Sequence, residues 1–145
     1  MSDQTSAREV AGNRSTGWKY VRTTVGTIFY LEDGPSDGRP LFLLHGFPDD
    51  PMGFDKVVDR IGNHGLRVIR PFLRGFGPTE IDELNARSGE PAALGQDVLD
   101  LADALGISVF KVAGHDWGSR AGHAAAILAP DRISGLLAKP ILYME

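Results

Sequence analysis

Alternating apolar and polar residues mark the first structured part of the chain. The alternation covers residues 18–22 and 26–32, and the segment that follows, 33–40, is dense in Gly, Pro and Asp. A period of two is typical of strands that bury one face, and clustered turn formers end such strands. We therefore predict an antiparallel hairpin followed by a loop.

Short apolar runs make up the strands of the remaining sequence. They have the size and β-branching of buried strands and lie at 41–44, 66–71, 109–113 and 133–138. Each of the first three is followed at once by a glycine-bearing segment, which is typical of a strand that leads into a loop at the edge of a sheet.

Three helices are predicted between these strands from apolar residues at helical spacing. The first covers 51–61, the second 91–105, and the third runs from the glycine turn at 114–118 to Pro130. Asp50 before Pro51 is a typical helix start, and Gly106 is a typical left-handed stop. The order β-α-β-α-β-α-β predicts an α/β fold, with a mainly parallel sheet, helices on both faces and the hairpin at one edge.

The composition fits one soluble domain, because 42% of the 145 residues are hydrophobic and 23% are charged. The sequence has no cysteine, which excludes disulfides and thiol catalysis and fits a reducing compartment. A net charge of −4 without a basic patch argues against nucleic acid as a partner. Residues 1–17 lack the apolar core of a signal peptide, and no later run approaches membrane-spanning length. We expect a flexible leader on a cytoplasmic protein that does not enter a membrane.

Candidate chemistry is concentrated in the turn 114–118, GHDWG. This pentapeptide has the form G-x-nucleophile-x-G, in which the central residue, here Asp116, sits on a strained strand-to-helix turn between two glycines. A carboxylate with an ordinary pKa near ~4 is ionised at neutral pH and needs no base for its first attack. Such a nucleophile suits displacement at saturated carbon, which gives an alkyl ester that water must then cleave.

Other interpretations of the turn stay open from these residues alone. Gly114 and Gly118 can simply close a strand-to-helix connection while Asp116 caps the helix. A phosphate site is less well supported, because no Gly-Lys-Ser/Thr follows and the carboxylate would repel an anion. The four histidines lack the paired spacing of metal ligands and are interpreted as structural or surface residues. No metal or other cofactor is expected.

Two further loops, HGFP at 45–48 and RGFG at 74–77, also leave from predicted carboxyl ends of strands, where sites form in such sheets. With the lead-in QDV at 96–98 and the turn 114–118, they make the chain similar to the α/β-hydrolase family over about residues 18–138. The resemblance is nearest to the N-terminal portion of the epoxide hydrolase and haloalkane dehalogenase branch.

This resemblance implies an incomplete α/β-hydrolase fold and a hydrolase of epoxides or related carbon electrophiles. Phe47 matches the epoxide hydrolase form, because dehalogenases often carry Asn at this place. The residues that the resemblance assigns are Asp116 as the nucleophile, the backbone N–H groups of Trp117 and Phe47 as the oxyanion hole, and His45, Gly46, Pro48 and His115 around the substrate.

The sequence also departs from the family pattern. Phe72 stands where Asp is common, which is expected to weaken the anchoring of the next loop, and Ser119 replaces a common glycine. The family places its cap, third acid and catalytic histidine after the last strand predicted here, so 18–145 is interpreted as the N-terminal part of the domain. An inactive truncated hydrolase or a non-catalytic binding or assembly module is the alternative. The apolar strand 133–138 would lie at a sheet edge, so a homo-oligomer or a complementing chain is expected in addition to a small-molecule substrate.

Overall fold

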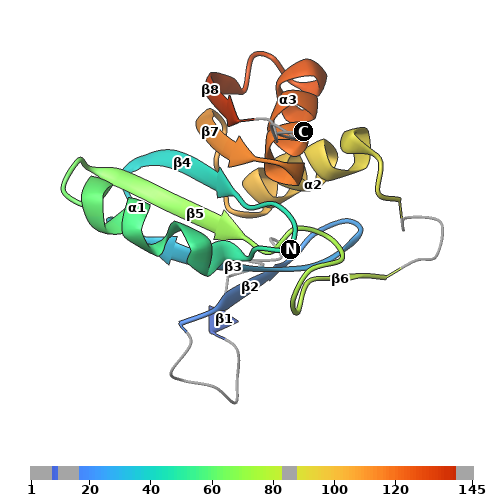
Figure 1. Cartoon of the computed structure of the whole chain (residues 1–145), viewed down its shortest axis with the longest axis horizontal. Coiled ribbons are helices and arrows are strands. Elements are labelled where there is room, and N and C mark those ends of the chain that lie inside the picture. Colours follow the sequence, from blue (N-terminus) through green and yellow to red (C-terminus); the bar gives the residue numbers. More distant parts are fainter. Residues whose placement is uncertain (1–7, 10–16, 83–87, 140–145) are drawn as a thin grey trace, which may run out of the picture.

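The computed structural model of the chain describes residues 8–9, 17–82 and 88–139 (Figure 1). Their strands form one eight-stranded sheet in the order β1-β2-β3-β5-β4-β7-β8, with β6 paired to β3. The strands are β1 (Arg8–Glu9), β2 (Lys19–Arg22), β3 (Gly26–Asp33), β4 (Arg39–Leu44), β5 (Leu66–Pro71), β6 (Glu80–Ile81), β7 (Phe110–His115) and β8 (Ile133–Lys139). The helices are the 3-10 helix η1 (Pro51–Phe54), α1 (Asp55–Ile61), α2 (Pro91–Ala104) and α3 (Trp117–Leu128).

The centre of the sheet is parallel and one end is antiparallel. β5, β4, β7 and β8 are parallel neighbours, whereas β2 and β3 form a hairpin whose second strand runs antiparallel to β5. This arrangement confirms the predicted fold class and the predicted place of the hairpin at an edge.

Neighbouring residues of the central strands face opposite sides of the sheet. Phe42 lies in register with Ile69 and Val112, and all three belong to the buried core with residues of α2 and α3. Arg70, next to Ile69, faces the other side and donates to the carbonyl of Pro51 in η1 at 2.9 Å. Figure 1 accordingly shows α2 and α3 together near β7 and α1 across β5. The prediction of helices on both faces is confirmed.

The first helix differs in detail from the prediction. Asp50 is the expected N-cap, since its side chain accepts from the Met52 N–H at 2.8 Å, but the first turn is 3-10 and α1 begins at Asp55. The predicted apolar face is only partly covered, because no residue of α1 is buried and Val57 is 41% exposed. This helix lies over the side of the sheet that carries Arg70, so it contributes little to the apolar core.

The shortest strands were not expected. β6 pairs with Gly26 and Thr27 of β3, and β1, inside the segment predicted to be a flexible leader, pairs with Lys19 and Tyr20 of β2. Two residues are too few to produce a periodic pattern, so only the tertiary contacts reveal these strands. The remaining leader residues 1–7 and 10–16, and much of the predicted irregular segment 82–90, lie outside the described residues.

Among the described residues, the outer edge of the sheet at β8 is apolar and has no further strand paired to it. β8 ends the strand order and exposes Leu137, which is 73% accessible. Ile127 and Leu128, which helical spacing predicts on the apolar face of α3, are 79% and 48% exposed beside this strand. The predicted apolar edge strand is therefore present, and it extends onto the end of α3. Over the described ranges, no helix combines the length and apolar character needed to cross a membrane.

Candidate active site

The backbone of Asp116 joins β7 to α3 in a conformation that side chains rarely adopt. Its φ of 55° is the only positive value among the described non-glycine residues. Hydrogen bonds on both sides hold this conformation: the Asp116 N–H donates to the Lys139 carbonyl at 3.1 Å, and the Asp116 carbonyl accepts from the Arg120 N–H at 3.1 Å. Strain of this kind is typical of residues presented for function.

Glycines allow the close approach of three chain segments around Asp116. A Cβ at Gly118 would overlap the carbonyl of Leu44, and one at Gly114 would overlap the carbonyl of Gly118. A Cβ at Gly46 would overlap the Asp116 side chain. Gly114 and Gly118 are thus needed because no side chain fits at their positions, as the sequence indicates. Gly46, on the facing loop, is needed for the same reason.

The Asp116 side chain does not cap the helix that it precedes. It occupies the N-cap position of α3 but makes no capping hydrogen bond. Instead, its Oδ2 accepts from the backbone N–H of Phe47 at 2.7 Å, a length typical of a charge-assisted bond. Trp117 is the first residue of α3, so its N–H has no partner within the helix. These contacts disfavour the capping interpretation and place a donor directly on the carboxylate.

His45 supports the loop that carries Phe47 from inside the protein. Its ring is fully buried, its Nε2 accepts from the Leu73 N–H at 3.1 Å, and its Nδ1 lies 3.1 Å from the Gly46 carbonyl. An acceptor at Nε2 requires the neutral ring with the proton on Nδ1. Burial lowers the pKa of His45, which agrees with this form. His45 therefore shapes the loop and does not itself reach the surface where a substrate would lie.

Of the other predicted residues, Gly46 and Pro48 lie in the loop that carries Phe47, and His115 lies at the end of β7. Gly46 and Pro48 flank Phe47, and the Phe47–Pro48 peptide bond is cis. His115 points toward η1, with its Nε2 3.6 Å from the Asp49 carboxylate and its ring edge against Phe54. These contacts are with Asp49 and Phe54, and the expected place of His115 around the substrate stays a prediction.

None of the histidines, all of which are described, forms a hydrogen bond with the Asp116 carboxylate. His64 lies beside the Ile61 carbonyl, and the Nδ1 of His123 lies 2.9 Å from the Ser119 carbonyl within α3. His45 and His115 are engaged as described above. Their interpretation as structural or surface residues is consistent with these contacts.

Comparison with known proteins shows the family to which the chain belongs. Residues 39–138 match the family described as the alpha/beta hydrolase fold. The chain belongs to this family. It is 33% identical over 99 residues to an epoxide hydrolase from Caballeronia sordidicola, a match that covers 68% of this chain and 30% of that protein. It is 32% identical over 115 residues to a haloalkane dehalogenase from Mycolicibacterium paratuberculosis, covering 76% of this chain and 36% of that protein.

A solved member of the family shares the fold of the described residues. The crystal structure of an epoxide hydrolase from Vigna radiata superimposes with a TM-score of 0.77 at 27% identity, covering 88% of this chain and 40% of that one. The resemblance to the epoxide hydrolase and haloalkane dehalogenase branch is thereby confirmed. The present chain spans only about a third of the length of the two curated relatives: 30% of the epoxide hydrolase and 36% of the haloalkane dehalogenase.

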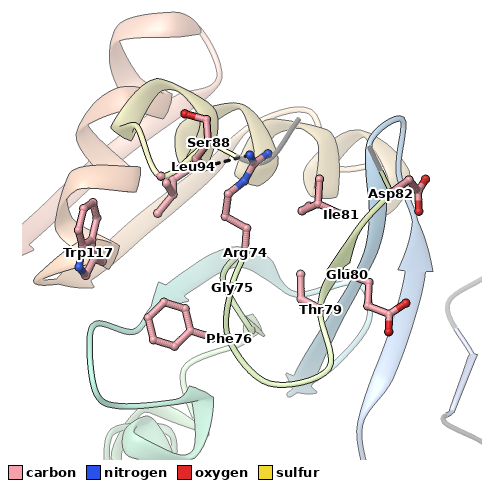
Figure 2. Close-up of a pocket in the computed structure, with 11 residues that line it drawn as sticks. Arg74, Gly75, Phe76, Thr79, Glu80, Ile81, Asp82, Ser88, Leu94 and Trp117 are labelled. Atoms are coloured by element: carbon pink, nitrogen blue, oxygen red, sulfur yellow. Dashed lines mark hydrogen bonds between the residues drawn. The ribbon is translucent and has the colours of Figure 1, made fainter. Parts of the chain in front are cut away.

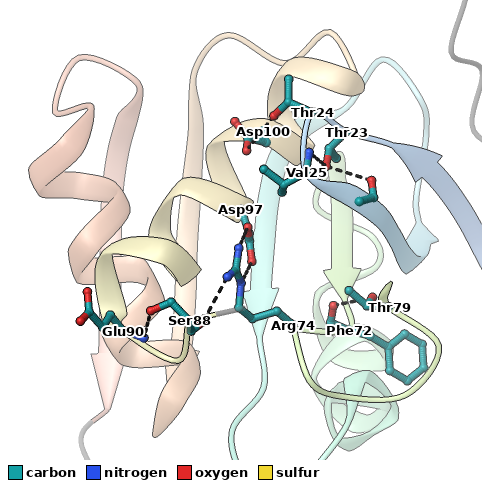
Figure 3. A network of polar contacts seen from close by, with 11 residues as sticks. Thr23, Thr24, Val25, Phe72, Arg74, Thr79, Ser88, Glu90, Asp97 and Asp100 are labelled. Atoms are coloured by element: carbon teal, nitrogen blue, oxygen red, sulfur yellow. Dashed lines mark hydrogen bonds and ion pairs between the residues drawn. The ribbon is translucent and has the colours of Figure 1, made fainter. Parts of the chain in front are cut away.

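A buried ion pair anchors the RGFG loop of this alpha/beta hydrolase to α2 (Figure 3). Arg74 donates to both carboxylate oxygens of Asp97 at 2.6 Å, and to the Ser88 carbonyl at 3.1 Å. Both side chains of the pair are 9% exposed. Burial raises the pKa of Asp97 while the hydrogen bonds from Arg74 oppose that rise, and the same bonds raise the pKa of Arg74. In the sequence, Asp97 was noted only as part of the family motif QDV at 96–98. Nothing there indicated that it pairs with Arg74.

The loop is held at its other end without the carboxylate that the family commonly has at position 72. The ring of Phe72 is buried and packs edge-on against Trp18, with 5.0 Å between centroids. The Thr79 hydroxyl donates to the Phe72 carbonyl at 2.9 Å and accepts from the Phe29 N–H at 3.1 Å. The loop is therefore anchored through Phe72 and Thr79, and the expected weakening relative to a carboxylate at position 72 stays a prediction.

Sequence reasoning missed a cavity of about 910 Å³ beside the elbow (Figure 2). It lies between the loop 74–82, the start of α2 and Trp117. Asp116 itself does not line it, but Trp117 is the next residue in the chain. No sequence signal could locate this space, because it depends on how the loop and the helix are placed relative to each other.

Proposed function

We propose that this chain carries the nucleophile of an epoxide hydrolase-like enzyme, with Asp116 as the attacking carboxylate. The observation that supports it best is the hydrogen bond of 2.7 Å from the Phe47 N–H to Asp116 Oδ2, made by a side chain that leaves its own helix uncapped. Named relatives that hydrolyse epoxides or remove halide from haloalkanes support the same reaction class.

In the first step, one oxygen of Asp116 attacks an epoxide carbon. A C–O bond to the enzyme forms as the ring C–O bond breaks, and the released alkoxide takes a proton from solvent water, leaving hydroxide, to become the hydroxyl of a hydroxyalkyl ester. Because Oδ2 is already bound by the Phe47 N–H, Oδ1 is the oxygen that we assign to the attack. The ester carbonyl then points toward the donors.

In the second step, water adds to Cγ of the ester, and the diol leaves. The negative charge that develops collects on Oδ2, where the N–H groups of Phe47 and Trp117 form the proposed oxyanion hole. This step needs a base for the water. All the histidines contact other groups, so we restrict the proposed chemistry of the described residues to ester formation and expect the ester to persist.

Phe47 favours an epoxide over a haloalkane as the substrate. The side chain of Phe47 is 66% exposed next to the carboxylate and offers no hydrogen-bond donor for a departing halide. An epoxide oxygen stays attached to the substrate and needs a proton instead.

We also propose that the apolar edge at β8 pairs with a second copy or a complementing chain, because unpaired apolar edges associate readily.

Intact mass spectrometry of the chain incubated with styrene oxide tests this function. We expect one adduct per chain that persists over hours, and none in Asp116→Ala. Asp59→Ala is the control, because Asp59 is an exposed carboxylate on α1, and it should be modified like the wild type. A folded wild-type sample that forms no adduct, or an Asp116→Ala variant that reacts at the same rate, would remove Asp116 as the nucleophile. Rapid turnover of the adduct would show that a base acts within this chain.

A further inference from the structure

A buried cation lies on the face of the sheet opposite to the apolar core and takes no part in the chemistry proposed above. Arg70 belongs to β5 in the middle of the sheet, in register with Leu31 of β3, and its side chain is only 6% exposed. Burial of a guanidinium is unfavourable unless hydrogen-bond acceptors compensate its charge. Its acceptors therefore indicate which parts of the chain it holds.

The guanidinium of Arg70 joins three elements. Its Nε donates to Asp33 Oδ2 at the end of β3, at 2.9 Å. Its Nη1 donates to Asp55 Oδ1 in the first turn of α1 at 2.6 Å, and to the carbonyl of Pro51 in η1 at 2.9 Å. A planar guanidinium serves acceptors in several directions with one fixed geometry, which an ammonium group on a flexible stem does not.

The contacts of Arg70 set the position of η1 over the sheet. Both η1 and α1 are described in full, and Pro51 is the one residue of the two that is buried. Pro51 is also the residue whose carbonyl accepts from Arg70. The ring of Phe54 adds a contact with His115, with 5.6 Å between centroids. The start of η1 is thus fixed by a hydrogen bond to a side chain that is itself buried.

Two tight turns connect Pro51 to the donor at the proposed nucleophile. The Asp49 N–H donates to the Gly46 carbonyl at 2.9 Å and closes a turn around Phe47. The Asp50 N–H donates to Asp49 Oδ1 at 2.9 Å, and the Asp50 carboxylate caps η1. Because these bonds leave the segment few free torsions, a shift of η1 is passed on to the N–H of Phe47.

Phe47 is therefore held from both sides of its loop. His45, two residues before it, is buried and hydrogen-bonded inside the protein. Arg70 fixes Pro51, four residues after Phe47, from the other face of the sheet. Between these two anchors, the Phe47 N–H donates to Asp116 Oδ2 at 2.7 Å.

We propose that Arg70 is a positioning residue, which aligns the Phe47 N–H with the Asp116 carboxylate from the opposite face of the sheet. The inference rests on the proposed function, because this N–H is one of the two proposed oxyanion donors. A displacement of about 1 Å at a catalytic group can cost about 100-fold in rate. The donor acts most strongly when charge collects on Oδ2, so Arg70 matters more for cleavage of the ester than for its formation.

Cleavage of the preformed ester by hydroxylamine measures the oxyanion donors without a base from the protein. The nitrogen adds to Cγ, the ester C–O bond breaks, the diol leaves with the proton released by the nitrogen, and Asp116 becomes a hydroxamate. Arg70→Met should slow this cleavage at least about tenfold, while formation of the ester from styrene oxide stays within about threefold. Equal cleavage rates in the wild type and Arg70→Met would overturn the inference.

Arg70→Lys provides a second variant that keeps the charge but not the planar fork, and its cleavage rate should lie between those of the wild type and Arg70→Met. Arg70→Met is expected to fold, because Asp33 and Asp55 are 30% and 62% exposed and stay hydrated without their partner. If it does not fold, Arg70→Lys decides: cleavage at the wild-type rate would refute the role of Arg70.

Arg39→Met is the matched control. The Arg39 guanidinium donates to the carbonyl of His64 at 2.9 Å, in the turn after α1, so it supports the same helix at the end far from Phe47. Both rates should stay within about twofold of the wild type. If Arg39→Met slowed cleavage as much as Arg70→Met, loosening of α1 in general would explain the effect and the assignment to Arg70 would be wrong.

Hydrogen exchange of the Phe47 amide tests the alignment without any reaction. Its exchange should be at least about fivefold faster in Arg70→Met than in the wild type, and unchanged in Arg39→Met. The Leu73 amide, which is bonded to His45, should be unchanged in both variants. If no ester forms while this pattern holds, the proposed function fails and the hold of Arg70 on the loop stands. If esters form but the Phe47 amide exchanges alike in all three proteins, the positioning role is wrong.

Discussion

Replacing His45 with Gln should remove most of the loss of stability that the chain shows between pH 7 and pH 5. The buried ring is held neutral, because its Nε2 accepts from the Leu73 N–H and burial lowers its pKa. Protonation would place an N–H of the ring against the N–H of Leu73 and put a charge inside the protein. Asp49 and Asp50 oppose the lowering of the pKa and His115 adds to it, but burial is the largest cause.

The sign follows from which state takes the proton first. The unfolded chain has an ordinary histidine pKa near ~6.5, so it binds a proton as the pH falls below that value while the folded chain does not. The stabilising contribution is therefore complete above about pH 6.5 and decreases as the pH falls. One proton changes the free energy of unfolding by at most about 1.4 kcal/mol per pH unit, so the loss at pH 5 is at most about 2 kcal/mol.

Urea denaturation at pH 7 and pH 5 measures this loss. His45→Gln keeps an acceptor for the Leu73 N–H but does not titrate, so its midpoint should change less with pH than that of the wild type. His64→Gln is the control, because His64 is an exposed ring in the turn after α1, and it should retain the pH dependence. The same loss in the wild type and in His45→Gln would refute the neutral buried ring.

Three further results are expected from the packing and the charges. Gly118→Ala should destabilise the fold by more than about 3 kcal/mol in urea denaturation, because its Cβ overlaps the Leu44 carbonyl, whereas Gly89→Ala in open space should stay within about 0.5 kcal/mol. Asp97→Ala should cost about 3–5 kcal/mol by removing the carboxylate that compensates the charge of the buried Arg74, and Asp103→Ala, whose side chain is 63% exposed, less than about 1 kcal/mol. Leu137→Lys should lower self-association in sedimentation velocity by placing a charge on the open edge strand, and an unchanged association would argue against β8 as the contact.

The sequence was most informative where the structure depends on neighbouring residues. The glycines around Asp116 and the apolar runs on either side of the turn are local signals, and they predicted both the strand-to-helix elbow and the parallel sheet. The residues alone left open whether Asp116 caps the helix. Only the hydrogen bond to the Phe47 N–H, from a loop 69 positions away, distinguishes the two interpretations.

Features that depend on distant contacts were beyond the sequence. Arg74 and Asp97 are 23 positions apart, and either could have been an exposed charge. The cavity beside Trp117 exists because the loop 74–82 and the start of α2 stand apart, which no periodic pattern encodes. Ile127 was expected on the apolar face of α3 but is exposed. Helical spacing locates the apolar stripe of a helix, but it does not show how much of that stripe a neighbouring element covers.

The central claim is that Asp116, and no other carboxylate near the loops, forms the ester. Tandem mass spectrometry of peptides from the chain treated with styrene oxide locates the added mass on a single residue. The account predicts that it lies on Asp116 in the peptide that contains the elbow, with Asp49 and Asp50 on the facing loop unmodified. Adducts on Asp49 or Asp50, or adducts spread over the exposed carboxylates with Asp116 unmodified, would contradict it.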